Sequence, residues 1–333
     1  MRRGRRVVYA PRLHRAAGSK PSLVAPSRRP KRVVLALGAN QVLSSGTHLI
    51  AKAAVMSLGA LPVALLRFTI ASIAFLVLGR IRGGWSKVDR RDIPRLLLIG
   101  FLVVPINQGF FLFGLVHSTP SHASLLYALT PLVVLALAGR MLREGNLGPK
   151  LAGAGVAFSG VVLILLERGL RQERQVLLGD ILILVAVFAW ALYTVLSKPL
   201  AERYGSLTVT AWAIISGTVF SLPGYLIPGV LPPLGSITPA VWAGILYLSI
   251  GTSLIAYPLW TYALKHVEAS KVAITTNLQP ILTTVFSWIL FRERLTPGFL
   301  VGAVLVLGGV TWVETRKVAP VALRAAGRAP EKA

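Results

Sequence analysis

Apolar stretches long enough to cross a membrane recur along the chain, separated by short segments that hold most of its charged residues. A spanning helix needs about 20 mainly apolar residues. Backbone polar groups inside a bilayer must also pair within the segment, which favours helices. The pattern therefore predicts ten transmembrane helices, at residues 33–57, 61–81, 94–116, 121–141, 148–167, 177–199, 207–228, 239–263, 269–291 and 296–315.

The composition agrees with an all-α integral membrane protein. Hydrophobic residues make up 54% of the chain, the mean hydropathy is +0.69, and only 14% of the residues are charged. A soluble protein of this length would need charged faces on most of its helices. The chain has no cysteine, and its five histidines lack metal-ligand spacing. We therefore expect no disulfide, no metal site and no cofactor.

The same pattern of residues occurs twice, at a separation of 149 positions. The matching pairs are His117 and His266, Ser121 and Ser270, Pro131 and Pro280, Arg143–Glu144 and Arg292–Glu293, Gly153 and Gly302, and Gly160 and Gly309. The first helices of the two halves align at a separation of 146, which pairs Lys52 with Lys198. We therefore expect two equivalent five-helix units, at 33–167 and 177–316, between a basic tail at 1–32 and a second tail at 317–333.

The distribution of basic residues predicts the orientation in the membrane. The net charge is +25, and residues 1–32 hold eleven Lys and Arg without an acid. With the N-terminus inside, 29 of the 36 basic residues fall on the cytoplasmic side and six fall outside. This bias places both termini in the cytoplasm of a multi-pass cell-membrane protein. The basic tail is expected to be disordered and to contact anionic lipid headgroups rather than nucleic acid.

Five helices per unit is an odd number, so the second unit enters the membrane from the opposite side. Inverted repeats of this kind are typical of secondary transporters, whose substrate site lies near the midplane between the halves. The sequence thus predicts two inverted repeats that open a shared cavity to each side in turn.

The residues of the repeat also carry a family resemblance. Pro131, Arg143–Glu144, Gly153 and Gly160, with their counterparts in the second half, resemble the EamA family of the drug/metabolite transporter superfamily. The resemblance covers about residues 33–316 and departs only at the two tails. It implies a ten-helix carrier of two inverted repeats that exports amino acids or related small metabolites. It does not name a substrate.

Polar and aromatic side chains inside the predicted helices are the candidates for a substrate site, because polar groups at membrane depth usually face a cavity or a partner helix. Amides and hydroxyls could orient a zwitterion, and aromatic rings could stack on an apolar or cationic group. The competing interpretation is that these groups hold helices together or form interfacial belts. The candidates are Gln41, Ser44, His48, Asn107, Gln108, Tyr127, Trp190, Tyr193, Tyr257, Trp260, Asn277 and Gln279.

Two of the repeated features have a structural interpretation. Pro131 and Pro280 are expected to kink their helices and to free carbonyls that line the cavity. The four repeated glycines, at 153, 160, 302 and 309, allow close helix packing, and the family resemblance implies a scaffold or a homodimer interface there.

Charged residues inside the predicted helices are scarce. Arg67 is the one full charge expected to be buried in a span, away from the helix ends where Lys52 and Lys198 lie, and we expect it to snorkel to the outer surface or to form an ion pair. The alternative is that it binds a substrate carboxylate in the outer vestibule. No acid lies in the middle of a span, so coupling to protons through a carboxylate is not expected, whereas His48 could either titrate or remain a neutral hydrogen-bonded residue.

Three other functions compete with an amino-acid carrier. A membrane-embedded enzyme would need a nucleophile with its base, paired acids or a metal cluster, and the sequence offers none of them. A nucleotide-sugar or lipid-linked carrier of the same superfamily is the closer alternative, although nucleotide phosphates would need several cations in the cavity and only Arg67 qualifies. A channel is the third alternative. We therefore expect a transporter of small amphipathic solutes that is not an enzyme.

Overall fold

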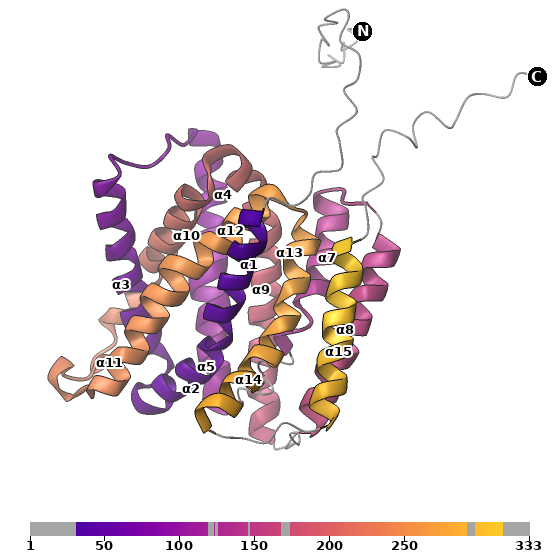
Figure 1. Cartoon of the computed structure of the whole chain (residues 1–333). Coiled ribbons are helices and arrows are strands. Elements are labelled where there is room, and N and C mark those ends of the chain that lie inside the picture. Colours follow the sequence, from indigo (N-terminus) through magenta and orange to yellow (C-terminus); the bar gives the residue numbers. More distant parts are fainter. Residues whose placement is uncertain are drawn as a thin grey trace, which may run out of the picture.

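A computed structural model of the chain describes residues 31–118, 123, 126–145, 147–167, 174–291 and 297–315, and throughout these ranges the regular secondary structure is helical, without a strand. Most of the helices lie side by side in one bundle (Figure 1). In chain order the α-helices are α1 (Lys31–Ser45), α2 (Thr47–Leu58), α3 (Ala60–Ile81), α4 (Ile93–Phe101), α5 (Phe110–His117), α7 (Thr130–Met141), α8 (Leu147–Glu167), α9 (Arg174–Tyr204), α10 (Ser206–Ser221), α11 (Pro239–Leu246), α12 (Tyr257–His266), α13 (Ala269–Ala273), α14 (Gln279–Phe291) and α15 (Pro297–Thr315).

Six helical segments in the described ranges are long and apolar enough to cross a membrane. They are Lys31–Leu58, Ala60–Ile81, Arg90–His117, Leu177–Tyr204, Ser206–Leu226 and Pro239–His266. Three shorter apolar helices accompany them, at Thr130–Met141, Leu147–Leu163 and Leu300–Val313. Large apolar side chains such as Leu35, Ile73 and Val304 are more than half exposed, as expected for surfaces that face lipid.

The predicted count of ten helices remains a prediction. The start of the predicted helix at 121–141, both predicted tails except residues 31 and 32, and the second Arg–Glu pair at 292–293 lie outside the described residues. The predicted helix at 269–291 is divided into α13, a 3-10 turn at Ile274–Leu278, and α14.

The third and the eighth predicted helices have matching bounds. Arg90–His117 and Pro239–His266 both have 28 residues and begin 149 positions apart, which is the separation of the sequence repeat. Each widens into a π-helix near its middle, at Leu102–Gly109 in the first and at Tyr247–Ala256 in the second. Such segments often mark functional positions in helices.

The first predicted helix is interrupted at Gly46, between α1 and α2. The hydroxyl of Tyr247 donates a hydrogen bond of 2.6 Å to the carbonyl of Leu43. A Cβ atom at position 46 would lie 2.6 Å from the same hydroxyl oxygen, so only glycine leaves room for the tyrosine. The Tyr247 hydrogen bond thereby connects the interruption between α1 and α2 with the π-helix of the second half.

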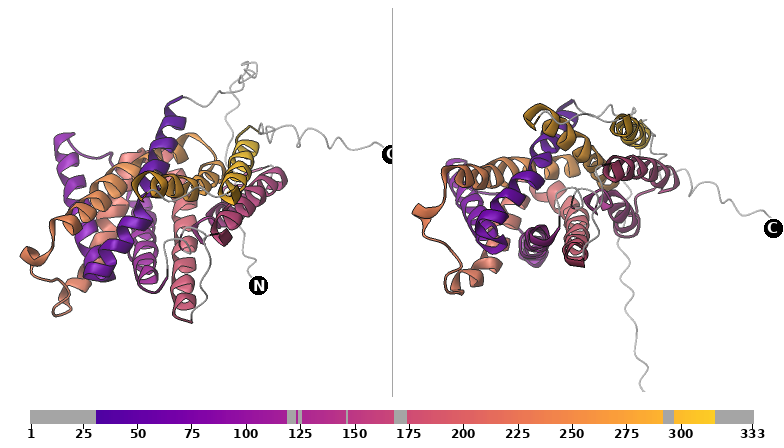
Figure 2. Two further views of the ribbon diagram at one scale, coloured as in Figure 1. Left: turned by 60° about the horizontal axis from the view of Figure 1, so that its bottom comes forward. Right: turned by 90° about the horizontal axis from the view of Figure 1, so that it is seen from below.

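The two halves of the chain interlock. Helix α1 packs against α12 and α14, while α9 packs against α5 and α7. Helix α10 packs against α3 and α4. The views of Figures 1 and 2 show α1 and α9 among helices of the opposite half. A large apolar core joins both halves and includes Phe68, Ile99, Val209 and Trp260.

The repeated glycines lie between α8 and α15, which run side by side at one edge of the bundle (Figures 1 and 2). A Cβ atom at Gly160 would lie 2.5 Å from the carbonyl oxygen of Gly302, and one at Gly309 would lie 2.5 Å from that of Gly153. The four glycines therefore bring two backbones of the same chain into close contact, in line with the scaffold interpretation.

The first Arg–Glu pair terminates α7 and joins it to α13. Arg143 adopts a left-handed backbone with φ of 55°, and the amide of Glu144 donates to the carbonyl of Ala138, a Schellman-type helix end. This turn directs the carboxylate of Glu144 to the first turn of α13. There it accepts hydrogen bonds from the amides of Ala269 (2.7 Å) and Ser270 (3.3 Å) and from the Ser270 hydroxyl.

Candidate functional site

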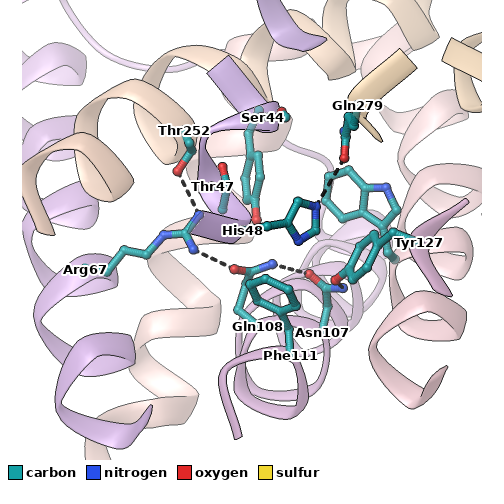
Figure 3. A pocket seen from close by; sticks show the side chains of 12 residues that line it. Ser44, Thr47, His48, Arg67, Asn107, Gln108, Phe111, Tyr127, Thr252 and Gln279 are labelled. Atoms are coloured by element: carbon teal, nitrogen blue, oxygen red, sulfur yellow. Dashed lines mark hydrogen bonds between the residues drawn. The ribbon is translucent and has the colours of Figure 1, made fainter. Parts of the chain in front are cut away.

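A small cavity lies at the centre of the bundle, lined by side chains from both halves (Figure 3). Its volume is about 60 Å³, which is room for a few water molecules. The lining residues come from the first span, α3, both π-helical spans, α9, α14 and the segment before α7. They are Ser44, Thr47, His48, Arg67, Asn107, Gln108, Phe111, Tyr127, Trp190, Thr252, Tyr257 and Gln279.

Arg67 supplies the positive charge of this cavity. Its side chain leaves α3 and is only 1% exposed. It donates hydrogen bonds to the amide oxygen of Gln108 (2.6 Å) and to the hydroxyls of Thr252 (2.9 Å) and Ser253 (3.1 Å). The expected snorkelling to the outer surface is therefore wrong, and no carboxylate in the described part of the chain forms an ion pair with this guanidinium.

A chain of amides connects Arg67 with Tyr127 across the cavity (Figure 3). Gln108 donates to the Asn107 side-chain oxygen at 2.6 Å. Asn107 in turn donates to the Tyr127 hydroxyl and to the carbonyl of Ala186, both at 2.8 Å. Because the bond to Ala186 fixes which end of Asn107 donates, it also orients Gln108 with its oxygen toward Arg67.

His48 lies on the opposite wall, 4% exposed. Its Nε2 is 3.4 Å from the side-chain oxygen of Gln279, and its ring makes edge contacts with Phe111 and Tyr127 at centroid distances of 5.4 and 5.6 Å. The other ring nitrogen, Nδ1, has no hydrogen-bond partner among the described residues. His48 thus lines the cavity with a hydrogen-bonding capacity that the described residues do not fully use.

Trp190 brings an aromatic surface to the cavity from the second half. Its ring is stacked on Tyr193 at 5.2 Å and lies 5.4 Å from Tyr257 and 5.5 Å from Trp260, measured between centroids. Trp190 and Tyr257 line the cavity, whereas Tyr193 and Trp260 form the layer behind them. The indole nitrogen of Trp260 donates to Thr194 at 3.3 Å, inside the protein.

Eight of the twelve predicted residues line the cavity, and four do not: Gln41, Tyr193, Trp260 and Asn277. Gln41 supports the site from behind, because its amide oxygen accepts a hydrogen bond of 3.0 Å from Gln279 and its nitrogen donates to Thr275 at 2.9 Å. Asn277 is fully buried, and neither end of its amide has a hydrogen-bond partner in the described ranges.

Pro131 and Pro280 each lie in the first turn of an α-helix, in α7 and α14. Proline is tolerated there because the first amides of a helix have no partner within it. At Pro280 the helix type changes just before the proline, from the 3-10 turn to α14. Neither proline is among the residues that line the cavity.

Four lining residues were not among the predicted twelve: Thr47, Arg67, Phe111 and Thr252. Arg67 had a signal in the sequence, as the one full charge expected to be buried in a span. Thr47 was visible as a polar residue one position before His48. Phe111 and Thr252 had no such signal, because one phenylalanine or threonine among many in apolar helices has no distinguishing pattern.

Comparison with known proteins agrees with a membrane carrier. The model of the EamA-like transporter family matches the chain twice, at residues 31–166 and 177–315. An uncharacterized transporter of Archaeoglobus fulgidus is 31% identical over 83% of this chain and 95% of its own. A protein of Streptantibioticus cattleyicolor named as a probable terminal-alkyne amino-acid exporter is 30% identical over 78% of this chain and 85% of its own.

A solved crystal structure shares the fold, with a TM-score of 0.72 and 18% identity, over 86% of this chain and 99% of that one. The two family matches cover both halves of the chain, and the membrane-spanning helices and the relatives agree with them. This membrane protein therefore belongs to the EamA-like transporter family.

Proposed function

We propose that the protein is a secondary transporter that moves small amphipathic metabolites, foremost amino acids, across the cell membrane by alternating access. The observation that carries this proposal is the central cavity. Its lining comes from both segments that the family model matches, for example His48 and Arg67 from the first and Trp190 and Gln279 from the second. A relative movement of the two halves would thus change access to the cavity.

The architecture that we propose is ten transmembrane helices in two inverted five-helix repeats. The repeat of 149 residues, the equal bounds of the third and eighth spans and the double family match support two equivalent units. The equivalent helices α5 and α12 lie toward opposite ends of the bundle (Figure 1), which supports the inversion. The excess of basic residues on one side favours cytoplasmic termini.

Amino acids are the favoured substrates for two reasons. The cavity combines amides, a histidine and a guanidinium with an aromatic wall, which suits a solute with a charged end and an apolar end. A relative of 30% identity is named as an amino-acid exporter, and this name favours export as the direction. A nucleotide sugar is disfavoured because Arg67 is the single Lys or Arg that the described residues bring to the cavity, whereas the phosphates of a nucleotide sugar call for several cations.

Counterflow in proteoliposomes tests this function. The purified protein would be reconstituted with internal unlabelled amino acid, and uptake of the same labelled compound would be followed. Phenylalanine, leucine and propargylglycine, an amino acid with a terminal alkyne, are the substrates to compare, with a nucleotide sugar as control. We expect saturable counterflow of at least one amino acid and none of the nucleotide sugar. Uptake that does not saturate would favour a channel, and transport of the nucleotide sugar alone would overturn the amino-acid assignment.

A homodimer remains a separate expectation. The small residues of α8 and α15 are used within the chain, but the outer face of α15 exposes Leu300, Val304 and Leu307 by at least half. Cross-linking in intact membranes would test whether this face meets a second copy or lipid.

A further inference from the structure

The guanidinium of Arg67 is a buried charge without a counter-ion in the described part of the chain. Its hydrogen-bond partners are the amide oxygen of Gln108 and the hydroxyls of Thr252, Ser253 and Tyr257, and none of them is a carboxylate. Burying an unpaired charge is costly, and arginines inside membrane proteins usually face an acid, a cavity or water. Because Arg67 lines the cavity, the anion that balances its charge can be a molecule bound there.

The side chains around Arg67 are oriented so that their oxygen atoms accept hydrogen bonds from the guanidinium. The hydroxyls of Thr252 and Ser253 use their own hydrogens on the carbonyl of Leu248, at 2.5 and 3.0 Å. Their oxygen lone pairs are thereby left to accept from Arg67. Gln108 presents its oxygen to the guanidinium for the same reason, since its amide nitrogen is engaged with Asn107.

Gln108, Thr252 and Ser253 take one N–H from each nitrogen of Arg67, and the Tyr257 hydroxyl in the cavity wall is a further side-chain hydrogen-bond partner. A guanidinium has five N–H groups, so these partners do not use all of them, and a ligand in the cavity can take what is left or replace the Tyr257 hydroxyl. Paired N–H groups of a guanidinium match the two oxygens of a carboxylate, and such charge-assisted hydrogen bonds are about twice as strong as neutral ones. The restraint by these partners means that little side-chain freedom is lost when the ligand binds.

The remainder of the cavity limits the size and charge of this ligand. Arg67 is the only Lys or Arg among the described residues that line the cavity, so it balances one negative charge but not the two charges of a nucleotide-sugar pyrophosphate. Arg67 lies on one side of the cavity, and Tyr127 and Phe111 lie across it (Figure 3). If the carboxylate of the solute binds Arg67, its apolar end points toward the aromatic residues. An ammonium group on the solute can also interact with the faces of these rings.

We infer that Arg67 binds the carboxylate of the transported solute and that the protein selects compounds with a single free carboxylate over their neutralised analogues. This inference rests on the proposed transport function and names the group that the substrate must carry. It assigns Gln108, Thr252 and Ser253 the role of positioning residues, which act through Arg67.

The test compares acids with their carboxamides. Wild-type protein in proteoliposomes would be assayed for counterflow of phenylalanine, leucine and propargylglycine, each against its own amide. We expect the acid to exceed the amide at least tenfold in initial rate for whichever amino acid is transported. Equal rates for acid and amide would overturn the inference and leave the proposed transport intact. If none of the three amino acids or their amides shows counterflow, the proposed function fails together with the inference.

Two variants separate substrate binding from a structural role. Arg67→Gln removes the charge, and we expect the ratio of acid to amide to fall to about one. Gln108→Glu keeps Arg67 and adds a carboxylate at its side, where the distance of 2.6 Å allows an internal ion pair. This second variant should fold, because it supplies the missing counter-ion, and it should lower acid transport at least tenfold without the same loss for the amide. If either folded variant keeps the wild-type ratio, Arg67 does not bind the substrate carboxylate.

Discussion

Lys52 and Lys198 make equivalent contacts in the two halves of the protein. Each ammonium group donates to carbonyl oxygens at the end of the third helix of its own half, and two of the acceptors of each lysine occupy equivalent positions. These two acceptors are Leu115 (2.6 Å) and Ser118 (3.0 Å) for Lys52, and Leu264 and Val267 (both 2.8 Å) for Lys198. Each lysine thus satisfies carbonyls that a helix end leaves without partners.

This contact predicts similar losses of stability from Lys52→Met and Lys198→Met. Each change leaves helix-end carbonyls without a donor, and we expect each to lower the free energy of unfolding by about 1–3 kcal/mol. Thermal unfolding in detergent measures the effect. The control is Lys87→Met in the exposed loop before α4, which should leave stability unchanged. A loss in only one of the two variants would contradict the equivalence.

Glu144 should be a major link between α7 and α13. Glu144→Ala removes the acceptor for two backbone amides and one partner of Lys150, whose nitrogen lies 3.2 Å from the carboxylate. Both side chains are only 5% exposed. We expect a loss of about 1–3 kcal/mol in the free energy of unfolding.

The matched control for Glu144 is Glu202→Ala, which breaks an ion pair with Lys198 on a side chain that is 50% exposed. An exposed pair four residues apart on a helix contributes less than about 0.5 kcal/mol. Equal effects of the two alanine changes would show that Glu144 does not stabilise the contact between α7 and α13.

Two neighbouring glycines of α15 provide a test of the close helix contact. Gly309→Ala would put a Cβ atom 2.5 Å from the carbonyl oxygen of Gly153, and we expect it to lower stability by about 1–3 kcal/mol. Gly308→Ala adds a Cβ with nothing within 4 Å and should be neutral or gain up to about 1 kcal/mol in helix propensity. Thermal unfolding measures the stability of both variants, and equal stability changes in the two would contradict the prediction.

Trp190 should set a preference for aromatic substrates. Trp190→Leu removes the ring that faces the cavity, and stacking accounts for about 0.5–1.5 kcal/mol beyond the area buried. We therefore expect the ratio of phenylalanine to leucine counterflow to fall by about two- to tenfold. Phe188→Leu on the same helix is the control, because that side chain is 53% exposed and should leave the ratio unchanged. An unchanged ratio in the Trp190 variant would show that the Trp190 ring does not contact the transported substrate.

Much of the candidate site could be predicted from polar residues in apolar helices. Asn107, Gln108 and His48 all line the cavity, because the cost of placing an amide or imidazole in lipid restricts it to the protein interior. The same reasoning could not separate Trp190 from Trp260. Aromatic residues are stable in a core, at an interface or in a cavity, so their composition alone does not select among these places.

The sequence by itself determined that the chain is a helical membrane protein with a repeated pattern, because the length of apolar runs and the spacing of repeated residues are properties of the chain alone. Only the tertiary structure decided what surrounds Arg67. Its partners Gln108, Thr252 and Ser253 lie 41, 185 and 186 positions away. Helical periodicity gives the face on which a residue lies but not the neighbour that the face meets, and that neighbour is set by the packing of all the helices together.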